Sequence, residues 1–233
     1  MKWFTKERLA IFILALACLV LVGSMGWRWY HNRKDYFLSG APPQDILEKV
    51  EPKKVPYDQI KPPAFLATDA LVIGSMSSTA GIAFYGDYAD SQSNALAREL
   101  ESWARNQGRV RFIWYYLPAK TDDNDVSFEA AVLSECSRLL DDAWQAHKLL
   151  ISLPKIDNQT LNLLADKLKD KDGLLYTCRQ DKNLRSYLRQ KIDIARGDGI
   201  DKAPFVFIGT HVFPAQSASS STMIRTAMSY LIN

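Results

Sequence analysis

The stretch that decides the fold is DALVIGSMSSTAGIAFYGDY, residues 69–88. It holds two apolar runs, residues 71–73 and 81–85, each with the length and composition of a buried strand. A helix is expected over about 93–106, where the apolar residues fall on one stripe, and Arg109–Leu117 has the β-branched and aromatic residues of another strand. A strand, helix and strand with a connection of this length predict a parallel pair.

A helical region follows, and the chain then returns to strands. Apolar residues on one face predict a long helix over about 126–153, and helical patterns together occupy about 122–198. Residues 204–213 change period and predict a strand, a turn and a second strand. A last helix begins at Ser220 or Ser221, either of which can cap it. The predicted order is β-β-α-β, a helical insertion, and β-β-α.

This order resembles that of the DsbA-like thiol oxidoreductases, which have a thioredoxin fold with an inserted helical domain. The resemblance covers residues 69–233. Besides the 69–88 stretch, it rests on VRFIWYYLP at 110–118, FEAA at 128–131 and APFVFIG at 203–209. The resemblance implies an α/β, thioredoxin-like (DsbA-like) fold.

The chain departs from that family where the family has its redox centre. The Cys-x-x-Cys motif would stand at the start of the first helix, but this chain has Asp90-Ser91-Gln92-Ser93 there. Thiol–disulfide exchange needs a thiolate stabilised by the helix N-terminus and a second, resolving thiol, and serine supplies neither. We therefore predict no catalytic residues and no enzymatic activity, with Asp90 serving as the N-cap of the helix.

Two enzymatic alternatives remain open. Enzymes of this fold that resemble kappa-class glutathione transferases and chromene-carboxylate isomerases use a serine at the helix start to orient the thiolate of glutathione, a role open to Ser91 or Ser93. The carboxylate of Asp90 would oppose such a thiolate. The second alternative is a redox protein that uses Cys136 and Cys178.

Ala203 and Pro204 stand immediately before a predicted strand. By resemblance, this architecture has a cis proline here that faces the redox site, and it leaves a neighbouring strand edge open to an extended polypeptide. Strand addition of this kind needs no cysteine. Polypeptide binding is therefore compatible with the altered helix start.

Cys136 and Cys178 lie within the helical insertion, 42 residues apart. Some DsbA-like relatives carry a second, structural disulfide in this region, so the resemblance implies a Cys136–Cys178 bond. The alternative is an inert buried thiol at Cys136, which falls on the apolar face of its helix.

The N-terminal part of the chain, residues 1–68, differs in composition from the rest. Residues 9–27 form an uncharged apolar run that predicts a transmembrane signal-anchor helix, with residues 1–8 in the cytoplasm. A cleaved signal peptide or lipidation at Cys18 is the alternative. Residues 28–68 are rich in proline and predict a stalk that leads to the domain at 69–233. The charges that flank the run do not set its orientation; we predict that the domain lies in the periplasm, anchored to a bacterial inner membrane.

The balance of charges and the spacing of cysteine and histidine residues limit the classes of function that the sequence supports. From residue 66 onwards, 19 Lys and Arg stand against 20 Asp and Glu, which disfavours nucleic acid as a partner. No cysteine or histidine cluster predicts a metal or cofactor, and His147 and His211 have no acidic neighbour in sequence. The predicted partners are the bilayer, through residues 9–27, and an extracytoplasmic protein. We predict a scaffold or protein-binding subunit, for instance of a secretion or conjugation assembly in the envelope.

Overall fold

The computed structural model describes residues 59–63, 71–74, 78, 81–140, 142–168, 173–214 and 220–231. The predicted transmembrane helix at 9–27, Cys18 and most of the 28–68 stalk lie outside these residues. Among the helices that are described, none has the length and apolar character needed to cross a membrane.

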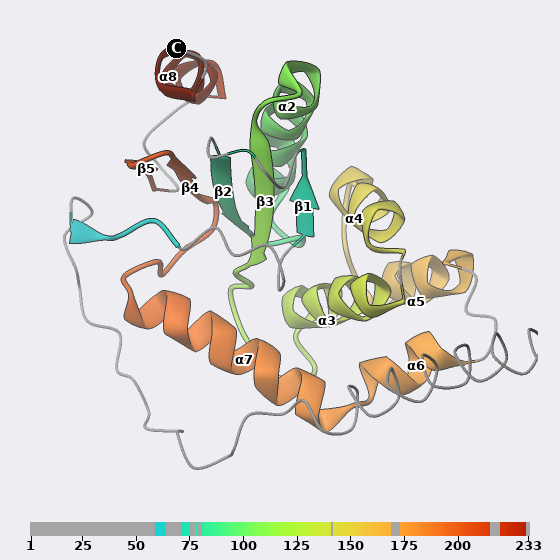
Figure 1. Ribbon diagram of the computed structural model, residues 1–233. Helices are drawn as coiled ribbons and strands as arrows, with labels where there is room; N and C mark the ends of the chain where they lie inside the picture. The colour runs from blue at the N-terminus through green and yellow to red at the C-terminus, as the bar shows by residue number, and fades with distance from the viewer. Residues whose placement is uncertain are drawn as a thin grey trace, which may run out of the picture. The chain divides into compact units, whose positions relative to one another are not determined.

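The described strands form one mixed sheet in the order β1-β3-β2-β4-β5 (Figure 1). Only β2 and β3 are parallel, as the strand–helix–strand pattern predicted, and the other neighbours are antiparallel. The strands are β1 (Leu71–Ile73), β2 (Gly81–Gly86), β3 (Arg111–Tyr116), β4 (Phe205–Ile208) and β5 (His211–Phe213).

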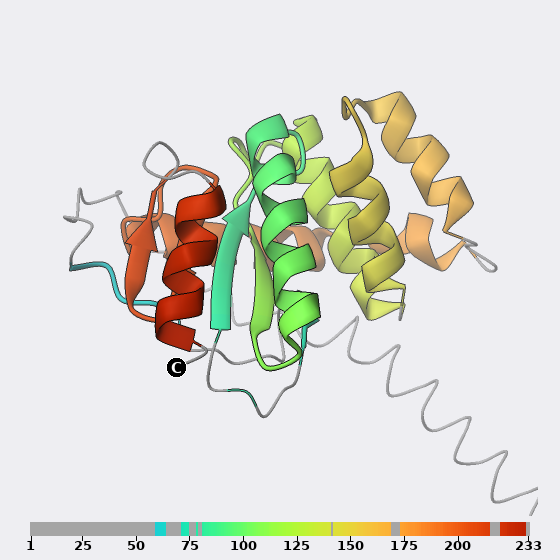
Figure 2. The same ribbon diagram turned by 90° about the horizontal axis from the view of Figure 1, so that it is seen from above.

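Helices α2 and α8 lie on one face of the sheet, and α7 crosses the opposite face (Figures 1 and 2). Helices α3 to α6 gather beside the β1 edge. The helices are α2 (Ser91–Gln107), α3 (Val126–Leu139), α4 (Ala143–Ser152), α5 (Asn158–Lys167), α6 (Leu174–Arg179), α7 (Lys182–Gly197) and α8 (Ser220–Leu231).

The observed element order matches the predicted one, but the single helix expected over 126–153 is wrong. The chain breaks into α3 and α4, because the N–H groups of Leu140 and Asp142 both bond back to the carbonyl of Ser137. These bonds close a tight turn, after which α4 starts in a new direction. Two helices of the insertion therefore pack against each other where one was expected.

Trp114 lies at the centre of the core and has no exposed surface. Its ring stacks between those of Phe84 and Tyr88, with centroid distances of 5.1 and 4.7 Å. Gly86 faces the same ring, and a Cβ at this position would overlap it. The absence of a side chain at Gly86 thus allows β2 to approach the indole closely.

Replacing Gly86 with alanine should lower the free energy of unfolding by about 1–3 kcal/mol, because the added methyl must displace a fully buried ring. Urea unfolding followed by circular dichroism measures the change. An unfolding midpoint equal to that of the wild type would contradict the packing described for Trp114.

Candidate functional site

The start of α2 is where the resemblance to DsbA-like proteins would place a redox centre. Asp90 precedes α2 as its N-cap, and its carboxylate accepts hydrogen bonds from the backbone N–H groups of Gln92 (3.2 Å) and Ser93 (2.9 Å). The hydroxyl of Ser93 donates a third bond to the same carboxylate, at 2.7 Å. The donors that would stabilise an anion at the helix N-terminus are thus engaged by Asp90.

This arrangement bears on the two serines considered as glutathione ligands. Ser93 is fully buried and its hydroxyl is engaged with Asp90, so it presents no donor to solvent. Ser91 is exposed, but it adjoins the negatively charged cap. The local geometry therefore offers a thiolate one hydroxyl and a repulsive carboxylate.

Asp87 fixes the position of the segment that leads into α2. Its carboxylate accepts the N–H groups of Ala89, at 2.8 Å, and Ala119, at 3.0 Å, and so ties the chain before α2 to the segment after β3. Burial raises the pKa of Asp87, against the lowering effect of hydrogen bonds from Ser127 and these amides. The carboxyl of Asp87 therefore connects two segments of the chain at the edge of the site.

Pro204 reaches the same end of the sheet from β4. The Ala203–Pro204 peptide bond is cis, and β4 begins at the next residue, Phe205, which pairs with Tyr85 near the end of β2. Because β2 leads into α2 through Asp87, the proline and the helix start are brought together by strand register. Pro204 is buried and Ala203 is partly exposed.

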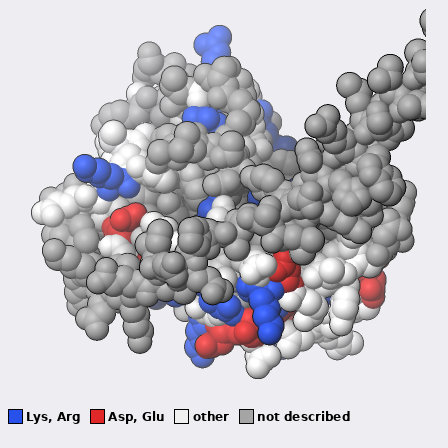
Figure 3. Space-filling view, turned by 60° about the horizontal axis from the view of Figure 1, so that its bottom comes forward, with Lys and Arg blue, Asp and Glu red and all other residues white. Residues whose placement is uncertain are grey.

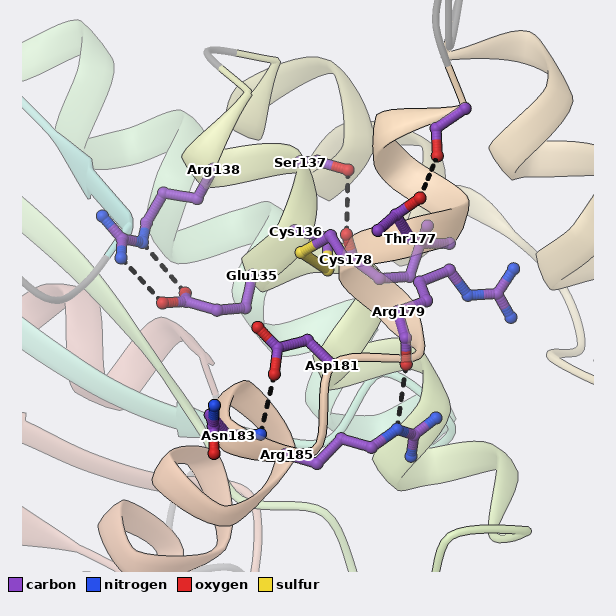
Figure 4. The surroundings of a disulfide bond; sticks show 12 residues. Glu135, Cys136, Ser137, Arg138, Thr177, Cys178, Arg179, Asp181, Asn183 and Arg185 are labelled. Carbon is purple, nitrogen blue, oxygen red and sulfur yellow. Dashed lines mark hydrogen bonds and ion pairs between the residues drawn. A yellow bond between two sulfur atoms is a disulfide. The ribbon is translucent and has the colours of Figure 1, made fainter. Parts of the chain in front are cut away.

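Cys136 of α3 and Cys178 of α6 are joined by a disulfide, with their Cα atoms 5.8 Å apart (Figure 4). Both residues are buried, with exposed fractions of 0% and 4%. Nearby, Glu135 pairs with the guanidinium of Arg138 at 2.7 Å. The bond therefore links two helices of the insertion and is not part of the α2 start.

Sequence reasoning missed a buried polar network beside the aromatic core. His147, which is fully buried, contacts the hydroxyl of Tyr88 through Nδ1 (2.8 Å) and the carboxylate of Glu101 through Nε2 (3.2 Å). The Tyr88 hydroxyl also meets Ser134 at 2.9 Å. These partners lie 46 or more residues apart in the chain, and no local pattern links them.

Charged side chains of both signs lie beside one another on the face seen in Figure 3. On the insertion, the guanidinium of Arg185 pairs with both Asp123 and Glu129, and Arg189 also pairs with Asp123. Within the described residues, no group of three or more His, Cys, Asp or Glu side chains is placed to hold a metal ion.

The architecture is similar to that of several solved thioredoxin-fold proteins. A thioredoxin-like oxidoreductase from Silicibacter pomeroyi DSS-3 is 15% identical, with 75% of this chain and 96% of that chain covered and a TM-score of 0.59. The thiol-disulfide exchange protein alpha-DsbA2 from Wolbachia pipientis is 16% identical (74% and 90% covered, TM-score 0.58). A periplasmic thioredoxin-like protein from Salmonella enterica serovar Typhimurium is 16% identical (72% and 94% covered, TM-score 0.58).

No protein-family model matches the chain, and no curated protein matches it in sequence. The structural neighbours are DsbA-like thioredoxin-fold oxidoreductases, and they confirm the predicted thioredoxin-like fold.

The prediction that the protein is not an enzyme is wrong by these comparisons. The proteins with this fold that it matches include a thioredoxin-like oxidoreductase and a thiol-disulfide exchange protein, and the chain itself carries a disulfide between Cys136 and Cys178. The prediction rested on the α2 start, which holds no sulfur, whereas the chain's disulfide lies in the insertion.

Replacing Asp90 with alanine should cost about 1 kcal/mol of unfolding free energy, because two backbone N–H groups and the Ser93 hydroxyl lose their acceptor. The matched control is Ser91→Ala at the adjacent exposed position, which should change stability by less than about 0.5 kcal/mol. Urea unfolding measures both, and equal midpoints for the two variants would contradict the capping role.

Proposed function

We propose that the protein binds an extended segment of another polypeptide at the end of the sheet where Pro204 meets the start of α2. The observation that carries this proposal is the strand register: Pro204 stands one residue before Phe205, which pairs with Tyr85 near the end of β2, the strand that leads into α2. Binding there uses backbone hydrogen bonds of the kind made in strand addition. It requires no thiol at Asp90 or Ser93.

The proposed setting is the periplasmic side of a bacterial inner membrane. One structural neighbour is described as periplasmic, and the apolar run at 9–27 supports a single membrane anchor followed by a proline-rich stalk. An anchored domain that grips a polypeptide suits a scaffold subunit of an envelope assembly, such as a secretion or conjugation apparatus. The partner is recognised by its extended backbone.

A photo-crosslinking side chain at position 202 should capture a reduced, carboxymethylated model polypeptide, because exposed Lys202 adjoins Ala203. The matched control carries the same group at Lys167, an exposed lysine at the end of α5. The full chain in detergent is irradiated with the polypeptide, and yields are compared by gel. We expect a crosslinking yield several-fold greater at position 202 than at position 167. Equal yields at the two positions would contradict the proposed binding site.

Thiol–disulfide exchange through Cys136 and Cys178 is the second candidate function. The bond observed between these residues favours it, as do the activities named for the structural neighbours. Exchange requires a sulfur to become accessible to an attacking thiolate, and both sulfurs are buried. The reaction would therefore need α6 to move away from α3.

This candidate predicts that the wild type accelerates dithiothreitol-dependent insulin reduction and that a Cys136→Ala/Cys178→Ala variant does not. The variant should also lose about 4 kcal/mol of unfolding free energy, since the bond closes a loop of 42 residues. Insulin turbidity and urea unfolding measure the two effects separately. Equal insulin rates, with the stability loss present, would leave the bond a structural role only.

A further inference from the structure

In the polar network around His147, the chemistry of the side chains determines which group donates each hydrogen bond and which accepts it. The carboxylate of Glu101 can only accept, so the Nε2 atom of His147 donates to it across 3.2 Å. Burial raises the pKa of Glu101, but hydrogen bonds from His147 and Arg105 outweigh it and bring the pKa below 4.5. Glu101 is therefore ionised, and the geometry assigns the Nε2–H tautomer to neutral His147.

The Nδ1 atom of this tautomer carries a lone pair and accepts the O–H of Tyr88 at 2.8 Å. The oxygen of Tyr88 then accepts the O–H of Ser134 at 2.9 Å. In this chain of hydrogen bonds from Ser134 to Glu101, each polar hydrogen is donated to one acceptor. The series joins α3, the segment before α2, α4 and α2 in one set of bonds.

We propose that His147 makes an acid-sensitive connection between the thioredoxin core and its helical insertion. Neutral His147 fits the series of bonds, whereas protonated His147 presents a second hydrogen at Nδ1, directly facing the O–H of Tyr88. The tyrosine must then turn its hydrogen away, and the bond between Tyr88 and Ser134 must reverse. Acid thus disturbs the bonds that tie α4 and α3 to Tyr88, in the segment before α2.

The surroundings of His147 favour its neutral form. Burial lowers its pKa below 6.5, and this effect exceeds the raising effect of the hydrogen bond that His147 donates to Glu101. The rings of Trp114 and Trp144 pack at 5.0 and 5.3 Å from the imidazole and exclude water from it. The titratable and charged groups that face this cluster are Tyr88, Glu101, Arg105, Tyr116, Glu135 and Lys148.

The sign of the effect follows from the depressed pKa. Below pH 6.5 the unfolded chain takes up a proton on this histidine that the folded protein does not, so stability falls as the pH falls. The stability that His147 contributes is present above pH 6.5 and is lost toward its lower folded pKa. From this residue alone, the unfolding equilibrium constant can rise by at most about tenfold per pH unit in that window.

The test compares urea unfolding of the full chain in detergent between about pH 5 and 6.5 for the wild type and His147→Gln. Glutamine can donate to Glu101 and accept from Tyr88 but does not titrate, so the variant should lose the part of the pH slope that His147 contributes. The matched control is His211→Gln, at a partly exposed position in β5, which should keep the wild-type slope. Equal slopes for the wild type and His147→Gln overturn the proposal.

A second measurement decides the question if His147→Gln does not fold. In the wild-type chain labelled with ¹⁵N-histidine, the ring nitrogens of His147 should show hydrogen on Nε2 alone at neutral pH, and the ring should become half-protonated only below pH 6.5. Hydrogen on Nδ1 at neutral pH, or half-protonation at or above pH 6.5, overturns the proposal.

Discussion

The stacking of Tyr88 on Trp114 is the contact on which the rest of the structure depends. The ring of Trp114 comes from the centre of β3, and Tyr88 stands two residues before the cap of α2, with the ring centroids 4.7 Å apart. The same tyrosine contacts Ser134 and His147 of the insertion. One buried ring therefore positions both the start of α2 and the helices that pack beside it. Because its hydroxyl needs partners once buried, the insertion is coupled to the core by necessity.

The start of α2 shows how one helix terminus can be retained while its chemistry changes. The positive end of the helix dipole and its free N–H groups favour an anion, whether a thiolate or a carboxylate. In this chain Asp90 supplies the anion from within, and Ser93 adds a hydroxyl bond to it. The N–H groups at the helix terminus therefore find their acceptor within the chain itself. A carboxylate cannot form the covalent bond to sulfur on which thiol exchange depends.

The sequence predicts features whose causes are local. The runs at 71–73 and 81–85 became strands because periodicity and composition act over a few residues, and the cap at Asp90 needs only its own turn of helix. The break after Leu139 escaped prediction because apolar spacing continues across it, while the turn is fixed by backbone bonds. The pairing of His147 with its distant carboxylate escaped for a different reason. Contacts across 46 residues leave no pattern in a single chain.

The two candidate functions make different demands on motion. The sulfurs of Cys136 and Cys178 are buried between α3 and α6, and α6 is also held by the ion pair of Arg179 with Glu129 at 3.5 Å. Attack on that bond requires these contacts to open first, because a thiolate must approach along the axis of the disulfide. Binding a polypeptide beside Pro204 requires no such opening. The proposed binding could thus use the ground-state structure as it is, whereas the proposed exchange would first require the free energy of releasing α6.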